Sequence, residues 1–244
     1  MKLSEEQLAQ FERDGYILLR GFVDKARCEA ILAAAKEEIE ARTPPIETEG
    51  EYTGSNNSTL RRLRQVYDRR EIFREWMTDK EIRPMLAQVL HDTPVLTLAH
   101  HNSIMTKMPS KSTESRWHQD RRYWHFENDN LVSVWLALGE ERMENGVLEF
   151  INGSHKLEYR PEQFDTDTSF MTGLPENDAL IAKKVHYDLH EGDVILFHCR
   201  TLHHAYDNQT DEPKIAFVYT VKGAATKPIP GTRSAEYPEV VLEV

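Results

Sequence analysis

The chain has little cysteine, a deficit of positive charge and no long apolar run. Two cysteines among 244 residues, Cys28 and Cys199, cannot form a disulfide framework, which favours a reducing, cytoplasmic location. The first residues lack the basic-then-apolar order of a signal peptide, and this supports the same expectation. Lysine and arginine number 30 against 41 aspartates and glutamates, so the net charge of −11 disfavours binding to nucleic acid or to an anionic membrane. No apolar stretch is long enough to span a bilayer.

Residues 1–94 are predicted to form a mainly helical layer. Ser4 and Gln7 have the spacing of a capping box and predict a short first helix. Asp24 is a suitable N-cap for a longer helix with one apolar stripe, and Pro44-Pro45 ends that helix. The layer is expected to pack on the β-rich remainder of the chain.

Residues 46–66 are the least regular part of this layer. A long irregular segment inside a compact domain is typical of a lid, of a binding loop or of disorder. The segment carries Arg61, Arg62 and Arg64, which either draw an anionic substrate toward a site or pair with surface carboxylates. Helix is expected again over residues 71–90, with a break at the proline within that range.

Residues 95–222 consist of short β-branched or aromatic runs separated by turn residues, without amphipathic helices between them. This pattern predicts an antiparallel sandwich or barrel. The expected strands are 95–99, 102–108, 115–120, 131–138, 147–151, 184–189, 193–198, 202–206 and 214–221. Residues 223–244 are expected to be a C-terminal tail. Because no linker is evident, residues 1–244 are predicted to be one domain, mostly β with N-terminal helices (α+β).

The most informative segment contains His118 and Asp120. Side chains two apart in a strand point to the same face, so this imidazole and this carboxylate are expected side by side. They would supply two ligands of a two-histidine, one-carboxylate triad, which leaves one face of Fe(II) open for oxygen chemistry. The pattern alone is not specific. The third ligand must come from a distant strand, where His203 and His204 are the candidates.

Lys214 begins the last predicted strand of the core. On that strand it shares one face with the small residues Ala216 and Val218, and bulky residues occupy the other face. A lysine among small side chains suits a cation that points into a cavity and binds a carboxylate. The alternative is an edge lysine beside a turn.

Several motifs together resemble the phytanoyl-CoA dioxygenase family of Fe(II)- and 2-oxoglutarate-dependent oxygenases. They occur in the family's order and span most of the chain. They are Leu3-Ser4-Glu5-Glu6-Gln7, Asp14-Gly15-Tyr16, Lys107-Met108-Pro109, Trp117-His118-Gln119-Asp120, Asn145-Gly146, Gly153-Ser154-His155, Gly192-Asp193 and the stretch from His203 to Lys214. The segment from His118 to His125 is also similar to ectoine hydroxylases. The resemblance implies a double-stranded β-helix (jelly-roll, cupin-like) core.

The resemblance also implies which residues hold the metal. His118 and Asp120 match the first two iron ligands of the family. The family places an asparagine five residues after the last ligand and the cationic 2-oxoglutarate anchor eleven after it. Asn208 and Lys214 fit these spacings if the ligand is His203, whereas His204 fits neither. The implied metal ligands, which are also the catalytic residues, are therefore His118, Asp120 and His203.

Further residues are implied around the co-substrate and the substrate. Lys214 stands where the family usually has arginine, and it would bind the far carboxylate of 2-oxoglutarate. Trp135 would flank the cofactor. Thr210 or the 102–107 strand would supply a hydrogen bond for which the family often uses a hydroxyl at the position of Ala205. The residues that follow Asp120 in the sequence would bind the substrate, namely Arg122, Tyr123 and Trp124.

The function implied is a dioxygenase that uses Fe(II), 2-oxoglutarate and O2 to hydroxylate a small molecule, with release of succinate and CO2. An anionic substrate is one of the two interpretations of the arginine cluster. The presence of Asp120 favours hydroxylation, because related halogenases lack this carboxylate. The alternative is a non-catalytic cupin-like protein that binds a metal or 2-oxoglutarate as a sensor, which Lys214 and Ala205 would suit. A zinc hydrolase on the same barrel is a third possibility, and it predicts activity without O2.

Overall fold

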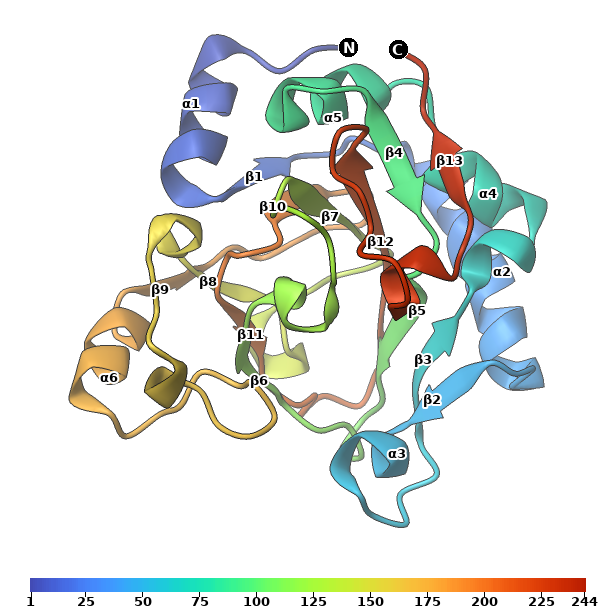
Figure 1. Cartoon of the computed structure of the whole chain (residues 1–244). Coiled ribbons are helices and arrows are strands. Elements are labelled where there is room, and N and C mark those ends of the chain that lie inside the picture. The colour runs from blue at the N-terminus through green and yellow to red at the C-terminus, as the bar shows by residue number, and fades with distance from the viewer.

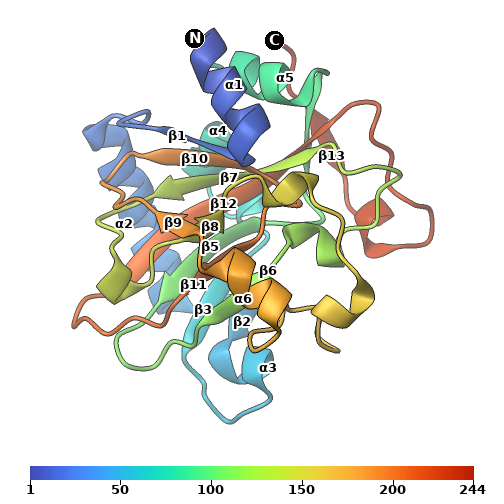
Figure 2. The ribbon, with the colours of Figure 1, turned by 90° about the vertical axis from the view of Figure 1, so that its left-hand side faces the viewer.

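The computed structural model describes all residues from 1 to 244 and contains two antiparallel sheets. The larger has nine strands in the order β1-β10-β7-β12-β5-β3-β2, with β4 added to β12 and β13 added to β4. The smaller has the order β6-β11-β8-β9. Figure 2 shows the strands of the larger sheet succeeding one another from β1 to β2.

Each of the nine strands predicted between residues 95 and 222 is present, as β4 to β12, and four further strands lie outside that range. The strands are β1 (Tyr16–Leu19), β2 (Ile46–Thr48), β3 (Leu60–Arg64), β4 (Pro94–Thr97), β5 (Asn102–Lys107), β6 (Ser115–His118), β7 (Leu131–Ala137), β8 (Glu149–Ile151), β9 (Lys184–His186), β10 (Val194–His198), β11 (His203–Ala205), β12 (Lys214–Gly223) and β13 (Glu239–Val241). The helices are α1 (Glu5–Asp14), α2 (Lys25–Ala41), α3 (Glu49–Thr53), α4 (Glu71–Met77), α5 (Arg83–Leu90) and α6 (Pro175–Ile181).

The start of α1 follows the predicted capping box. The Ser4 hydroxyl accepts a hydrogen bond from the backbone N–H of Gln7, and the Gln7 side chain accepts one from the backbone N–H of Ser4. The helix ends at Gly15, whose φ of +87° is the left-handed conformation that favours glycine. This end matters for the core, because the chain then turns directly into β1, an edge strand of the larger sheet.

The two faces of the larger sheet pack against different layers, and β12 shows why. Phe217 and Tyr219 belong to the main core, which they share with α2, α4 and α5. Ala216 and Val218 belong to a second core, which they share with Phe150 of the smaller sheet. Figure 1 shows α2 and α4 on one side of the larger sheet and the smaller sheet on the other. The small residues on the inner face leave room for a cavity between the two sheets.

Several segments outside residues 95–222 add strands to the larger sheet. Residues 46–66 form β2, α3 and β3, so they are part of the sheet rather than a loose lid, and β3 pairs with β5 through Leu63 and Ile104. The helical layer therefore also contributes β1, β2 and β3 to the larger sheet. The tail contributes β13, which pairs with β4. None of the helices is both long and apolar enough to cross a membrane.

Candidate metal centre and co-substrate cavity

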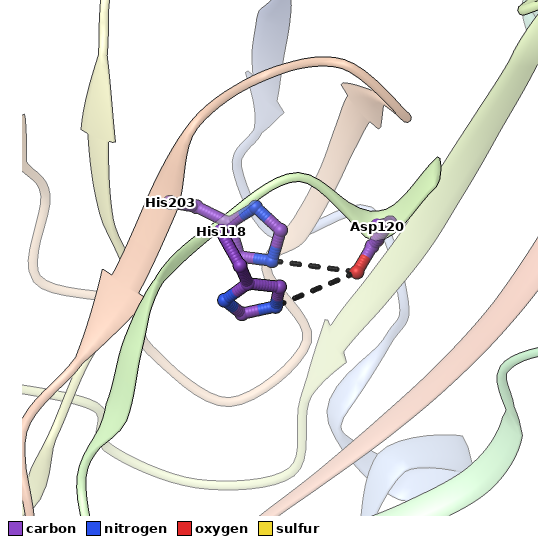
Figure 3. Close-up of side chains that lie close together, drawn as sticks. All are labelled: His118, Asp120 and His203. Atoms are coloured by element: carbon purple, nitrogen blue, oxygen red, sulfur yellow. Dashed lines mark ion pairs between the residues drawn. The ribbon is translucent and has the colours of Figure 1, made fainter. Parts of the chain in front are cut away.

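His118, Asp120 and His203 meet between the two sheets. His118 is the last residue of β6 and pairs across the ladder with His203 of β11. Asp120 was predicted to lie on the same strand as His118, but it opens the short 3-10 helix η2 (Asp120–Tyr123) instead. Its carboxylate still points toward both imidazoles. The Nε2 atoms of His118 and His203 lie 3.7 and 3.5 Å from Oδ1 of Asp120 (Figure 3). The three ligand atoms all lie within 4.8 Å of one another.

The two imidazoles are held in the orientation that a metal requires. Nδ1 of His118 lies 2.7 Å from the carbonyl oxygen of Arg116, and Nδ1 of His203 lies 2.9 Å from that of Thr201. A carbonyl oxygen can only accept, so each Nδ1 carries the proton and each Nε2 directs a lone pair at Asp120. Burial lowers the pKa of both imidazoles, which keeps them neutral and able to coordinate.

Asp120 has two partners outside the triad. Its Oδ2 accepts a hydrogen bond of 2.7 Å from the Ser133 hydroxyl on β7, and its Oδ1 lies 2.9 Å from Nε2 of His101. Burial by itself would raise the pKa of this carboxyl, but the neighbouring imidazoles of His101 and His203 outweigh it and hold the pKa well below its usual range. The carboxylate is therefore ionised. Two neutral imidazoles and one carboxylate on one side of a common point fit Fe(II).

From the sequence, His100 and His101 cannot both face one site, and the structure places His101 at the cavity. Sequence reasoning did not single out Ser133, whose only signal is that it lies in a strand whose other residues are apolar. A buried serine in an apolar strand has to find an acceptor, and here the acceptor is a metal ligand.

A cavity of about 70 Å³ beside the triad is lined by residues of both sheets. Three of these residues are cations, namely Arg61, Lys107 and Lys214. A larger, more open groove of about 450 Å³ lies elsewhere on the surface, and it contains none of the three metal-ligand candidates. We therefore assign the co-substrate chemistry to the smaller cavity.

Lys214 is buried in this cavity and paired with a carboxylate. Its Nζ lies 3.1 Å from Oε2 of Glu141 and 2.5 Å from the carbonyl oxygen of Gly146. The other oxygen of Glu141 accepts a hydrogen bond of 3.0 Å from the indole N–H of Trp135. The two predicted co-substrate residues, Lys214 and Trp135, thus both line the cavity and meet at one fully buried glutamate.

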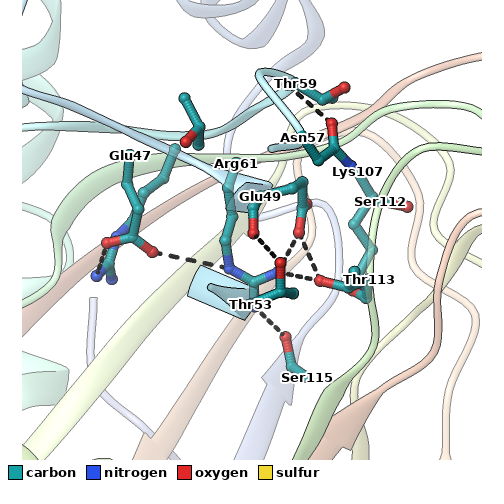
Figure 4. A network of polar contacts seen from close by, with 12 residues as sticks. Glu47, Glu49, Thr53, Asn57, Thr59, Arg61, Lys107, Ser112, Thr113 and Ser115 are labelled. Carbon is teal, nitrogen blue, oxygen red and sulfur yellow. Dashed lines mark hydrogen bonds and ion pairs between the residues drawn. The ribbon is translucent and has the colours of Figure 1, made fainter. Parts of the chain in front are cut away.

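The arginine cluster of residues 61–64 is paired within its own hairpin. Arg61 donates to Glu49 at 3.0 Å, and Arg62 donates to Glu47 at 2.6 Å. Arg64 also donates to Glu47 (Figure 4 shows the network around Arg61). Of the two interpretations of this cluster, the structure supports the second, in which the arginines pair with carboxylates.

The remaining predicted site residues lie outside the cavity lining. Thr210 donates its hydroxyl hydrogen within its own turn, where Asn208 and Glu212 accept. Arg122 donates to the Ser169 hydroxyl at 3.2 Å. Tyr123 is exposed, whereas Trp124 is buried with its ring centroid 5.4 Å from that of His101. Trp124 therefore reaches the metal site through His101, and the roles of Thr210, Arg122 and Tyr123 stay predictions.

A two-histidine, one-carboxylate triad between the sheets of a sandwich, beside a basic cavity, defines the class of iron- and 2-oxoglutarate-dependent oxygenases. Within that class, the chain belongs to the phytanoyl-CoA dioxygenase (PhyH) family, whose sequence model matches residues 11–216. The predicted family and the predicted enzyme class are confirmed.

Individual relatives agree with this assignment. Phytanoyl-CoA dioxygenase domain-containing protein 1 of Bos taurus is 24% identical over 267 residues, which cover 91% of each chain. Ectoine dioxygenase of Halomonas elongata is 26% identical over 239 residues, which cover 89% of this chain and 70% of the relative. The predicted similarity to ectoine hydroxylases is thus confirmed.

A solved structure confirms the fold. The epimerase SnoN, in complex with Fe3+, alpha-ketoglutarate and nogalamycin RO, superposes with a TM-score of 0.77 at 21% identity, covering 93% of this chain and 86% of that one. The predicted jelly-roll core is confirmed, although the sheets do not close into a barrel. The cofactors bound in that structure are iron and 2-oxoglutarate (alpha-ketoglutarate), the ones that the sequence predicts for this chain.

Proposed function

We propose that the protein is a dioxygenase that hydroxylates a small molecule and releases succinate and CO2 from 2-oxoglutarate. The observation that carries the proposal is the convergence of His118, Asp120 and His203 on one point beside a basic cavity. When bound there, iron together with 2-oxoglutarate and O2 supplies the oxidising power that inserts oxygen into a substrate C–H bond.

The chain's own residues prepare this chemistry. His118, Asp120 and His203 would hold the iron by one face, which leaves the opposite face for 2-oxoglutarate and O2. The fixed Nδ1 hydrogen bonds and the buried, ionised Asp120 mean that little reorganisation is needed when the metal binds. The far carboxylate of 2-oxoglutarate would enter the end of the cavity that holds the lysines.

The substrate side is proposed on the opposite flank of the triad. There His101 contacts Asp120, and Trp124 packs against His101, so an aromatic and imidazole surface faces the metal. Arg122 and Tyr123 follow on the same turn and would meet the outer part of the substrate. The arginine cluster of residues 61–64 is paired with glutamates, whereas Arg122 makes no ion pair and is the predicted substrate residue that would attract an anionic substrate. We also propose that residues 1–244 form one domain, since one core joins helices and sheet.

The proposal is tested by loading the protein with Fe(II) without oxygen, admitting air and measuring succinate formed from 2-oxoglutarate across a panel of small substrates. We expect succinate formation that depends on iron and rises with the right substrate. His118→Ala and Asp120→Ala should each abolish it. Normal turnover by either variant would remove the metal assignment.

A second candidate is a sensor that binds metal and 2-oxoglutarate without turnover. It is favoured by one observation: Lys214 is already paired with Glu141, so the predicted co-substrate anchor carries no free charge. Tight metal binding without succinate release on any substrate would support the sensor. Hydrolysis without O2 would instead indicate a zinc hydrolase.

A further inference from the structure

The C-terminal segment, residues 224–238 between β12 and β13, lies beyond the part of the chain that the family's sequence model matches. It folds back against the stretch that follows η2. The backbone N–H of Ile229 donates to the carbonyl oxygen of His125 at 2.9 Å, and that of Glu127 donates to the carbonyl oxygen of Lys227 at 2.9 Å. The C-terminal segment is therefore hydrogen-bonded to the chain just after the turn that carries a metal ligand.

Ser234 joins this segment to two other parts of the structure. The residue is 1% exposed, and its Oγ accepts the backbone N–H of His125 at 2.9 Å and lies 2.8 Å from Nε2 of His100. Burial lowers the pKa of His100 to about 3, so the hydroxyl meets a neutral imidazole. His100 lies between β4 and β5, where no strand pairing fixes its side chain. The contact with Ser234 is thus the polar contact that orients this ring.

His100 and His101 flank the indole of Trp124. The ring centroid of Trp124 lies 5.4 Å from that of each histidine, with interplanar angles of 30° to His100 and 80° to His101. Nε2 of His101 in turn lies 2.9 Å from Oδ1 of Asp120. The contacts therefore run without a gap from a metal ligand, through the two imidazoles and the indole, to the hydroxyl of Ser234.

The surroundings of Trp124 make these two histidines important for its orientation. Trp124 belongs to a small cluster with Phe126, Leu131 and Cys199, which is separate from the two larger cores. It is 8% exposed, so part of its ring borders solvent. A ring at the edge of a small cluster has fewer apolar neighbours to hold it than a ring in a main core. Its position therefore depends on the imidazoles on either side.

We propose that Ser234 is a positioning residue: through His100 it fixes the indole of Trp124 at the substrate side of the metal site. This inference rests on the proposed function, because it takes the flank with Trp124 as the place where the substrate binds. The C-terminal segment then helps to decide which small molecules fit, although three aromatic rings separate Ser234 from the metal ligand Asp120.

The position of Trp124 is measured by fluorine NMR on protein labelled with fluorotryptophan. The chain has four tryptophans, and Trp124→Phe identifies the resonance of Trp124. Mn(II) should broaden this resonance in the unmodified protein, because the ring packs on His101 beside a metal ligand. In Ser234→Ala the resonance should shift and the broadening should weaken, because the indole is no longer held in one place. The resonance of Trp76, in the main core, and the Kd of Mn(II) should stay unchanged.

Kinetics then show whether this position matters for the substrate. With the best substrate of the panel, Ser234→Ala should raise KM about two- to tenfold, the range expected when one buried hydrogen-bond partner is lost. The Kd of 2-oxoglutarate for the Mn(II)-loaded protein, measured by calorimetry without oxygen, should stay unchanged. A general loosening of the fold would move both quantities, so the split between them is specific to positioning.

Thr226→Val is the matched control. Thr226 is a buried residue of the same segment, but its hydroxyl donates to Oδ1 of Asn128 at 2.8 Å. The control should keep the Trp124 resonance and the KM. His100→Phe keeps a ring beside Trp124 and removes the nitrogen that meets Ser234, so it should act like Ser234→Ala. Because both substitutions interrupt the same contact, the double variant should show less than the sum of the two effects.

The outcomes separate this inference from the proposed function. If the unmodified protein forms no succinate with any substrate, the proposed function fails, whatever the NMR shows. If it turns over and Ser234→Ala leaves the Trp124 resonance or the KM unchanged, the inference is overturned and the function stands. Equal effects of Thr226→Val, or additive effects in the double variant, also overturn it. Should Ser234→Ala not fold, His100→Phe decides, because an unchanged Trp124 resonance in that variant contradicts the inference.

Discussion

The two adjacent histidines of β11 have different surroundings, although they are neighbours in sequence. His203 directs Nε2 at Asp120, whereas the ring of His204 stacks on Trp117 at 5.2 Å and lies 3.3 Å from a carboxylate oxygen of Glu149. Adjacent residues of a strand point to opposite faces, so only His203 directs its ring at Asp120. The spacing to Asn208 and Lys214 identified the same residue from the sequence.

We therefore expect His203→Ala to abolish Mn(II) or Fe(II) binding and His204→Ala to leave it nearly intact. Calorimetric titration of the metal into each variant, without oxygen, measures this. Far-ultraviolet circular dichroism checks that both variants are folded. Equal metal affinity in the two variants, or the reverse order, would contradict the choice of ligand.

Ser133 is the residue through which the larger sheet supports the metal site. Its hydroxyl donates to Oδ2 of Asp120, and the oxygen that remains for the metal is Oδ1. Loss of such an outer partner typically weakens metal affinity by about 10–100-fold. We expect Ser133→Ala to do so without unfolding the protein. Thr97→Val is the control, because it removes a buried hydroxyl of β4 that makes no hydrogen bond; a similar loss in both would exclude a specific role for Ser133.

Lys107, one of the cations that line the cavity, predicts how co-substrate binding depends on pH. Burial, together with the nearby charges of Lys214 and Arg61, lowers the pKa of this lysine to about 7. The carboxylates of Glu49 and Asp207 act in the opposite direction but do not prevent the shift. Lys107 is thus cationic below neutral pH and loses its charge as the pH rises.

The sign of the effect follows. A bound carboxylate favours the protonated lysine, so binding takes up protons near pH 7 and the affinity for 2-oxoglutarate falls as the pH rises from 6 to 9. Calorimetry in buffers of different ionisation enthalpy measures the proton uptake. The affinity of Lys107→Met should be much less dependent on pH; an unchanged pH dependence in that variant would assign the titration to another group.

Among the secondary-structure elements, the hairpin of β2 and β3 shows the limit of sequence reasoning. The run Leu60-Arg61-Arg62-Leu63-Arg64 does not alternate cleanly, and its partner β5 lies some forty residues further along the chain. The buried Arg61 and the half-buried Arg62 are balanced by the opposite charges of Glu49 and Glu47. Neither the pairing nor the partner could be read from local pattern.

The same hairpin predicts a large stability effect. Glu49→Ala would remove the close partner of the buried Arg61 at 3.0 Å and leave only the longer ion pair with Glu47 at 3.8 Å, which costs up to about 3–5 kcal/mol in comparable buried pairs. Urea unfolding measures the change in the free energy of unfolding. Glu29→Ala is the control, because Glu29 and Lys25 form an exposed pair that contributes about 0–1 kcal/mol. Equal effects of the two variants would show that the Arg61 network does not stabilise the fold.

Elements with local signals were predicted well. The capping box of α1 and the N-cap Asp24 of α2 depend only on residues three apart, and both are present in the structure. The two faces of β12 were also predicted, because alternation along a strand needs no knowledge of its partner. The tail strand β13 was missed, since three residues with weak alternation give too little signal.

For the molecule as a whole, the metal ligands were predictable because they are tied to motifs, and the charge balance of the cavity was not. The sequence placed Lys214 in the cavity, but its partner Glu141 comes from a turn seventy-odd residues earlier. The sequence therefore could not show that Glu141 balances the charge of Lys214. Lys107 lay within a recognised motif, yet only the register of β5 against β12 shows that it shares the subsite.

The account depends most on one claim, that His118, Asp120 and His203 bind a single metal ion. A crystal structure of the protein grown with Mn(II) and 2-oxoglutarate tests it directly through anomalous scattering from the metal. We predict one strong peak about 2.0–2.3 Å from Nε2 of both histidines and from a carboxylate oxygen of Asp120. A peak held by other residues, or an ion that contacts only one member of this triad, would contradict the account.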